Sequence, residues 1–127
     1  ENFLFLPYQD KKDIPYSMTA CDVSLVSVSE GMESLVAPSK LYPALAAGRP
    51  IAVVCPEGTY LEELVCKHNC GVVIRNGRSD ELTMFIRLLS QDEEILDTMG
   101  MDARKAMNEH FTPQVISRQY IRALIPE

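Results

Sequence analysis

The order of apolar patterns along the chain constrains its fold more strongly than any other feature of the sequence. Short runs rich in Val, Ile, Leu and Phe predict buried strands at residues 2–7, 22–28, 50–55 and 71–74. Apolar side chains spaced three or four positions apart predict helices between them, at residues 14–21, 39–47 and 60–68. Strands that alternate with helices and are apolar throughout are typical of a parallel sheet covered on both faces. The predicted fold class is therefore α/β, a Rossmann-like three-layer sandwich.

The last part of the chain has the pattern of a C-terminal helical segment. Ser79 is a candidate cap for a helix with an apolar stripe, and Ser90 with Glu93 has the spacing of a capping box for the next helix. Thr112 followed by Pro113 predicts the start of a last helix, because threonine caps helices and proline is favoured at the first helical position.

Size and charge limit the classes of partner. The chain has 127 residues, 46% of them apolar, which is enough for one domain with its own core. Its net charge of −6 argues against nucleic acid and anionic membrane as partners. It begins at Glu1 without a methionine and continues directly into an apolar run, so we expect it to be part of a larger protein.

The four cysteines favour a reducing compartment. An even number is compatible with disulfides, but the irregular spacing of Cys21, Cys55, Cys66 and Cys70 favours free thiols in a cytoplasmic protein. Cys66, His68 and Cys70 suggest zinc ligands at first sight. A structural zinc site needs four ligands, commonly in two clusters, and no second cluster is present, so we expect no metal site.

The connection after the second predicted strand is the strongest candidate for chemistry. Ligands of open parallel sheets bind at the carboxyl ends of the strands, and Ser29–Pro38 is longer than the usual strand-to-helix loop. It leads to Ser39 and Lys40, where backbone amides, a hydroxyl and an ammonium could bind a phosphate. The alternative is a capping serine and a solvated lysine. Neither a P-loop nor a dinucleotide glycine motif occurs.

Two carboxylates lie in the same loop. Glu30 and Glu33 fit an acid/base pair, acceptors for sugar hydroxyls, or simply solvated charges. His68 and His110 fall near the ends of predicted helices and outside the candidate loops, so a surface or capping role fits them better than catalysis.

Several segments together resemble a known enzyme family. These are Asp22-Val-Ser-Leu-Val, Glu30-Gly-Met-Glu33, Ala37-Pro-Ser-Lys-Leu-Tyr42 and Ala44-Leu-Ala-Ala-Gly-Arg-Pro-Ile51. They resemble the donor-binding half of family-4 (group 1) glycosyltransferases, and the resemblance covers essentially residues 1–127. It implies a partial C-terminal nucleotide-sugar-binding domain of a GT-B enzyme, whose two Rossmann-like domains face each other across a cleft.

The resemblance also implies an activity. Such enzymes retain the anomeric configuration, use no metal or other cofactor, and most often take a UDP-sugar as donor. The acceptor would be part of a polysaccharide or glycolipid. An N-terminal acceptor domain in the same protein would complete the enzyme, so we expect this part alone to be inactive and any membrane contact to depend on the full-length protein.

Roles carried over from the family fall on three groups of residues. Those near the base would be Pro7, Tyr8 and Gln9; those near the sugar would be Gly31, Met32 and Glu33; those near the diphosphate would be Ser39 and Lys40. Glu33 is the candidate catalytic residue, and Arg49 is a possible second cation. The family's Glu-x7-Glu pattern is missing, because Leu35 and Pro43 stand at its two positions. We therefore expect Pro43 to lie beside the ribose without a carboxylate to bind its hydroxyls.

Two other classes remain as alternatives. A nucleotide-sugar epimerase of GT-B fold differs from a transferase in the other domain. A non-catalytic receiver-like module shares the alternating pattern, but it needs an acidic pair after the first strand and an aspartate after the third. Leu6-Pro7-Tyr8 and Cys55-Pro56-Glu57 do not supply them.

Overall fold

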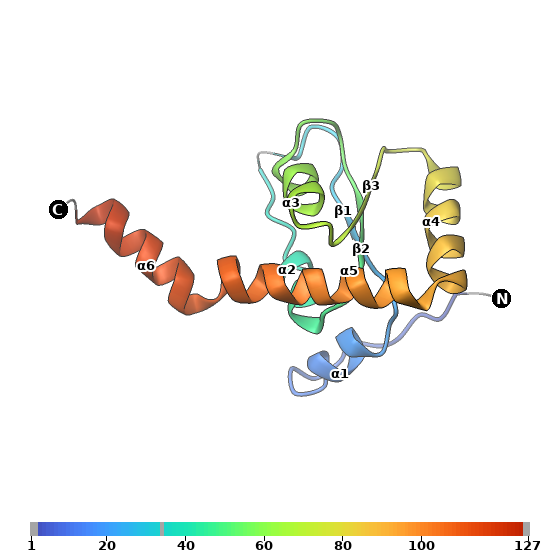
Figure 1. Ribbon diagram of the computed structural model, residues 1–127, viewed down its shortest axis with the longest axis horizontal. Helices are drawn as coiled ribbons and strands as arrows, with labels where there is room; N and C mark the ends of the chain where they lie inside the picture. The colour runs from blue at the N-terminus through green and yellow to red at the C-terminus, as the bar shows by residue number, and fades with distance from the viewer. Residues whose placement is uncertain (1–2, 34, 126–127) are drawn as a thin grey trace.

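A three-stranded parallel sheet forms the centre of the molecule (Figure 1). The computed structural model describes residues 3–33 and 35–125. Strands β1 (Ser24–Ser27), β2 (Ile51–Val54) and β3 (Gly71–Ile74) lie in that order, with Ser24 opposite Ile51 and Ile51 opposite Gly71. The α/β class predicted from the alternating pattern is confirmed.

One face of the sheet is covered by the helices that connect its strands. Helix α2 (Leu41–Ala47) joins β1 to β2, and α3 (Tyr60–His68) joins β2 to β3. The core between sheet and helices includes the buried residues Val26, Val28, Leu41, Leu45, Ile51, Val53, Leu61 and Val65. The short helix α1 (Ile14–Thr19) precedes β1 and contacts α2.

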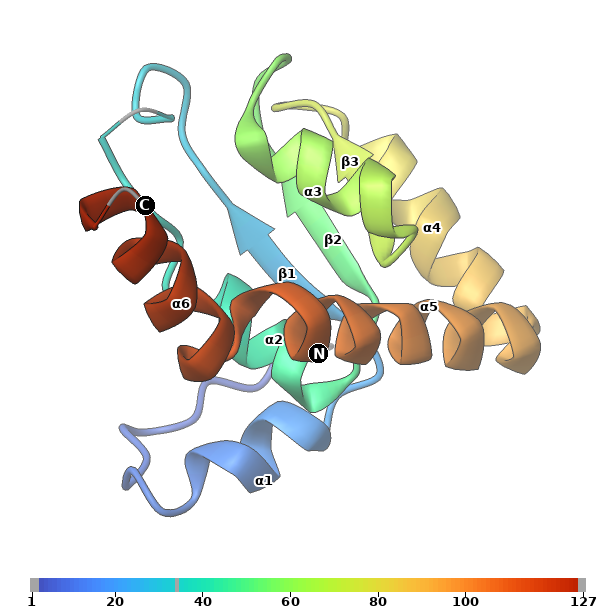
Figure 2. The same ribbon diagram turned by 60° about the vertical axis from the view of Figure 1, so that its left-hand side comes forward.

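The other face is covered by α4 (Ser79–Gln91), which places Phe85 and Leu89 against Ala52 and Ile74. Helix α5 (Glu93–Ala106) runs across the molecule and contacts α2, α3 and α4 (Figure 2). Helices therefore lie on both sides of the sheet, which gives the three layers. Leu25 of the edge strand β1 remains 54% exposed, because α4 covers only the β2 and β3 side of this face.

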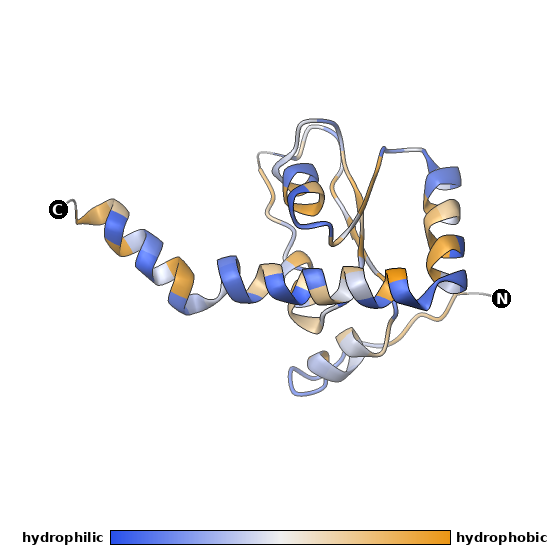
Figure 3. Ribbon diagram, in the orientation of Figure 1, coloured by the Kyte–Doolittle hydropathy of each residue, from blue (hydrophilic) through white to orange (hydrophobic). Residues whose placement is uncertain are grey.

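The C-terminal segment leaves the body of the molecule. A π-helical turn, η1 (Met107–Phe111), links α5 to α6 (Pro113–Leu124), and α6 has no buried residue. Apolar and polar side chains alternate around α6, as Figure 3 shows by colour. Within residues 3–33 and 35–125, no helix has both the length and the apolar character needed to cross a membrane.

Two predicted elements have their predicted limits, and β1, β2, α1 and α2 lie within two residues of theirs. Helix α3 and strand β3 have the predicted limits, Gly48 ends α2 in the left-handed conformation, and the Thr112 side chain caps α6 by accepting from Val115 N. Helix α2 begins at Leu41 rather than at Ser39.

The caps predicted for α4 and α5 are wrong. Ser79 is the first residue of α4, and its cap position is held by Arg78, which makes no side-chain capping bond. Helix α4 continues through Ser90, whose hydroxyl donates to Arg87 O. Asp92 caps α5 by accepting from Ile95 N, because a carboxylate directly before the helix reaches the free amides better than a serine two residues earlier.

The first predicted strand is also wrong. Residues 3–10 form no strand, and the side chains of Phe3–Leu6 are all exposed; Asn2 lies outside the described residues. An apolar run forms a strand only where a neighbour supplies ladder hydrogen bonds. No described strand pairs with this segment.

Candidate functional site

The loop between β1 and α2 lies at the carboxyl ends of the strands, as the long connection predicted (Figure 1). Its fold is held mainly by turns of its own backbone: Met32 N donates to Ser29 O at 3.1 Å, and Val36 N donates to Met32 O at 3.1 Å. Gly31 adopts a positive φ of 82°, which glycine tolerates best. Loop residues Glu30, Gly31 and Met32 are exposed, so this segment is accessible to a ligand.

The two loop carboxylates have different surroundings. Gly31 N donates to Glu33 Oε1 at 2.8 Å, so the Glu33 side chain folds back on its own turn. Glu30 is exposed and forms no hydrogen bond or ion pair with another described residue. Their use as an acid/base pair stays a prediction.

The start of α2 keeps several backbone donors free. Lys40 holds the cap position without a side-chain capping bond, Leu41 N donates to Pro38 O, and Ala44 N donates to Lys40 O. Among the described residues, no acceptor bonds the amides of Ser39, Lys40 or Tyr42, and no carboxylate pairs with the Lys40 ammonium. Pro43 has no N–H, which reduces the number of donors that this helix start can offer.

Helix α3 begins at the same edge of the sheet, and side chains of the protein accept hydrogen bonds from backbone amides at its start. Thr59 is buried and accepts from Glu62 N at 3.3 Å, while Glu62 Oε2 accepts from Gly58 N at 2.8 Å. Arg75 Nη2 donates to the other oxygen of Glu62 at 2.5 Å. The pKa of Glu62 is lowered first by the Arg75 hydrogen bond and then by the Gly58 amide, and that of Arg75 is raised by the same pairing.

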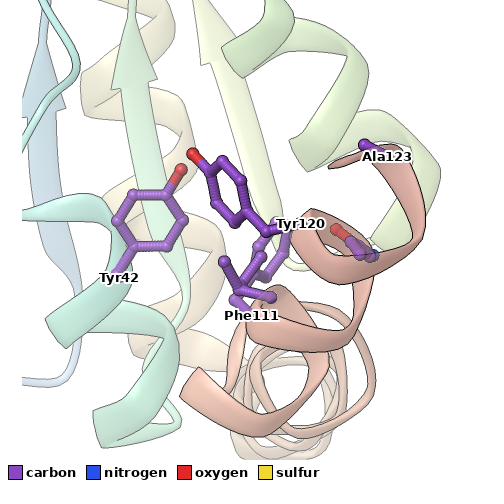
Figure 4. Close-up of a pocket in the computed structure, with 6 residues that line it drawn as sticks. Tyr42, Phe111, Tyr120 and Ala123 are labelled. Atoms are coloured by element: carbon purple, nitrogen blue, oxygen red, sulfur yellow. The ribbon is translucent and has the colours of Figure 1, made fainter. Parts of the chain in front are cut away.

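An apolar groove lies beside the start of α2. It has a volume of about 590 Å³ and is lined by Tyr42, Phe111, Ile116, Gln119, Tyr120 and Ala123. Figure 4 shows Tyr42 on α2 and Tyr120 on α6 lining different sides of it. The Tyr42 and Phe111 rings are 5.4 Å apart. No local sequence pattern indicates this groove, because its walls come from helices about 70 positions apart in the chain.

Tyr60 is the first residue of α3. Burial raises the pKa of the Tyr60 hydroxyl, and the nearby Tyr42 raises it further. Both tyrosines stand in the first turn of their helices.

The two histidines lie outside the loops, as predicted, but their rings pack against each other at a tilt. The His68 and His110 rings are 4.9 Å apart, and the pKa of His68 is lowered first by burial and then by His110. Burial raises the pKa of the Cys70 thiol to about 11, while Cys66 is exposed. All four cysteines are free thiols, and no three His, Cys, Asp or Glu side chains within the described ranges gather as metal ligands.

Two predicted site positions lie elsewhere. Residues 3–10 and α1 lie toward the amino ends of the strands in both views, away from the β1–α2 loop (Figures 1 and 2). Pro7, Tyr8 and Gln9 are therefore not assembled with that loop; Tyr8 is 98% exposed, and Gln9 Nε2 donates to Pro7 O.

Arg49 is not a second cation of the site. It follows α2, and its Nη2 donates to Thr19 O at 2.6 Å. Helix α2 runs back from the carboxyl edge, so a residue at its end lies at the opposite edge from Lys40.

Comparison with known proteins gives one informative similarity. The chain is 26% identical over 122 residues, 95% of its length, to a Pseudomonas aeruginosa protein named "Probable glycosyltransferase WbjE". The matched region spans only 29% of that protein's length. No protein-family model and no solved structure matches the chain.

Proposed function

We propose that the chain is the donor-binding part of a glycosyltransferase. The observation that carries the proposal is the start of α2, where the amides and Lys40 have no partner among the described residues and follow a long, exposed loop at the carboxyl edge of a parallel sheet. Similarity to a protein named as a probable glycosyltransferase supports the same class of reaction.

In this proposal the donor is a nucleotide-sugar, with UDP as its expected nucleotide. Its diphosphate binds the amides near Ser39 and Lys40, and its sugar lies against Gly31, Met32 and Glu33. Pro43 offers the ribose an apolar contact and no hydrogen-bond acceptor. Pro7, Tyr8 and Gln9 are left out of the proposed site because the segment of residues 3–10 runs near the amino ends of the strands in both views (Figures 1 and 2).

The chemistry follows from the charge of the leaving group. Transfer breaks the bond between the anomeric carbon and a diphosphate oxygen, and negative charge grows on the departing diphosphate. Preorganised amides and the Lys40 ammonium stabilise that charge without requiring a metal ion. A retaining course, and an acceptor in polysaccharide or glycolipid synthesis held by another domain of the protein, complete the proposal.

The test is a calorimetric titration of the full-length protein with UDP. Lys40→Ala should weaken UDP binding about ten- to a hundredfold, because a charge-assisted hydrogen bond contributes roughly 1.5 to 3 kcal/mol. Lys67→Ala is the matched control, since Lys67 lies in the last turn of α3, at the far end from the sheet edge. Equal affinity of the native protein and Lys40→Ala would refute the role of Lys40, and absence of binding to both would refute the donor site.

A further inference from the structure

Strand β1 has a neighbouring strand on one edge only. Val28 N, directly after β1, donates to Val54 O at 2.9 Å, so the backbone of Val28 faces β2. Successive residues of a strand direct their backbone groups to opposite edges. The N–H and C=O groups of Leu25 and Ser27 therefore point away from β2. In the described part of the chain no residue forms a hydrogen bond with them.

One face of β1 is uncovered as well. The side chains of Ser24 and Val26 are buried, whereas those of Leu25 and Ser27 are exposed. All-parallel sheets normally have both faces covered, so their strands bury side chains on both sides. Strand β2 follows this rule, since its first three side chains are all buried. Leu25 is therefore an apolar side chain of a parallel sheet that lacks the usual cover.

The opposite edge of the sheet is built differently. Strand β3 also has one neighbouring strand, but helices α3 and α4 both contact it. Its four side chains are all buried or half-buried. No described helix contacts β1 as extensively as α3 and α4 contact β3. An unpaired edge and an uncovered face therefore occur together at β1 and not at β3.

We infer that the outer edge of β1 binds a further β-strand, supplied by a part of the full-length protein outside residues 1–127. An unpaired strand edge presents donors and acceptors in a regular row, and an extended backbone is the partner that satisfies them. Strand β1 contains no charged residue, proline or bulge, which are features that protect a free edge from pairing. The added strand also places a side chain beside Leu25 and reduces its exposure.

Chain length and charge identify the source of the strand. The similar Pseudomonas aeruginosa protein is matched over only 29% of its length, so most of such a protein is available to supply a strand. A strand of the same polypeptide is held near β1 at a high effective concentration. A second copy would bring together two chains of net charge −6. The apolar run Phe3–Leu6 belongs to the segment that lies toward the amino ends of the strands in both views (Figures 1 and 2).

Hydrogen exchange of the full-length protein, resolved to single amides, tests the inference. The amides of Leu25 and Ser27 should exchange at least about a hundredfold more slowly than in an unstructured peptide, because a paired amide exchanges only when its strand opens. The amide of Val26, which faces β2, is the internal reference for a paired position. Exchange of Leu25 and Ser27 at the unstructured rate, with Val26 slow, would overturn the inference.

A proline substitution tests the same edge in another way. Ser27→Pro removes an outward N–H group, which a free edge tolerates and a paired edge does not. Exchange at Leu25 should therefore become about tenfold faster or more in Ser27→Pro. Ser27→Ala is the matched control, because it keeps the N–H group and should exchange like the native protein. Unchanged exchange at Leu25 in folded Ser27→Pro would count against a paired strand.

Two further measurements identify the source of the strand. Slow exchange at Leu25 should persist on dilution, whereas its loss would indicate a second copy and overturn the inference. It should also persist in the double variant Leu4→Pro, Phe5→Pro, which cannot form a strand at Phe3–Leu6. Loss of slow exchange in that variant would assign the strand to Phe3–Leu6 instead. None of these measurements uses UDP, so their outcome is independent of the proposed donor site.

Discussion

Helices α2 and α3 begin at the same edge of the sheet, yet their first turns are built differently. The start of α3 is filled by the protein: Thr59 caps Glu62 N, and the Glu62 carboxylate occupies the amide of Gly58. The start of α2 has no side-chain cap, and Lys40 beside it has no described ion-pair partner. A carboxylate already sits where an anion would bind at α3, so of these two helix starts α2 is the one whose amides lack partners among the described residues.

The difference has a simple origin in residue types. Gly58-Thr59 followed by Glu62 supplies a hydroxyl at the cap position and a carboxylate three residues later, which is a capping box. At α2 the cap position holds Lys40, and three residues later stands Pro43, which can neither cap nor donate. One helix start is therefore complete in itself, and the other is open.

The largest effect should come from Gly71, which holds β3 against β2. A Cβ at this position would overlap the backbone carbonyl of Ile51. Gly71→Val should therefore separate the strands, move Arg75 away from the α3 start, and lower the free energy of unfolding by about 3 to 5 kcal/mol. Urea denaturation measures this. Gly77→Ala is the control, because a Cβ at Gly77 would meet no atom within 4 Å and the positive φ is the one source of strain for the alanine.

The caps themselves provide the next test. Thr59→Val removes the hydroxyl that caps α3 and should lower the free energy of unfolding by about 1 to 2 kcal/mol. Ser39→Ala should change it by less than about 0.5 kcal/mol, because Ser39 is exposed and caps nothing. Urea denaturation measures the free energy of unfolding of both variants. An equal loss in Ser39→Ala and Thr59→Val would contradict the comparison.

The two loop glycines should behave alike, although the loops differ. Gly31 and Gly58 both have positive φ, and a Cβ at either would meet nothing within 4 Å. Gly31→Ala and Gly58→Ala should each cost about 1 kcal/mol, since only backbone strain distinguishes them from the native protein. A much larger cost at Gly31, measured by thermal denaturation, would mean that the α2 loop is held more firmly than its hydrogen bonds indicate.

The smallest effect concerns pH. The pKa of Glu62 is lowered in the folded protein from its ordinary value of 4.5, so its pairing stabilises the fold above that pH and is lost as pH falls through the lowered pKa. The difference in unfolding free energy between the native protein and Glu62→Gln should be constant near neutral pH. It should shrink on acidification below about pH 4.5. A difference that grows toward acid would reverse the sign and exclude this role.

The sequence predicted the elements of the α/β unit well because their signals are local. The apolar run at β3, the apolar spacing of residues 60–68 and the Thr112-Pro113 start are each signals within one short segment. The run at residues 2–7 has an equally strong pattern, but a strand also needs a paired neighbour. Periodicity alone does not report whether that neighbour is present.

The candidate site could be predicted only where it follows the chain. The loop Ser29–Pro38 and the start of α2 are adjacent in sequence, and their placement at the sheet edge follows from parallel topology. The ion pair of Arg75 with Glu62 and the groove between Tyr42 and Tyr120 each join residues that are far apart in the sequence. In the sequence Arg75 has no feature that distinguishes it from other loop arginines. The register of β2 and β3 places it beside Cys55 and Pro56.

The π-helical turn of η1 makes the direction of α6 depend on chain length. Residues Met107–Phe111 continue α5 with a wider turn before Thr112 starts α6, and they place Phe111 on Tyr42 and His110 on His68. Each residue of an α-helix advances the chain by about 100°. Deleting one residue in η1 would therefore turn α6 by about a quarter of a circle and remove one wall of the groove. The five-residue length of η1 therefore sets the direction of α6. Substitutions in η1 keep this length, whereas a deletion changes it.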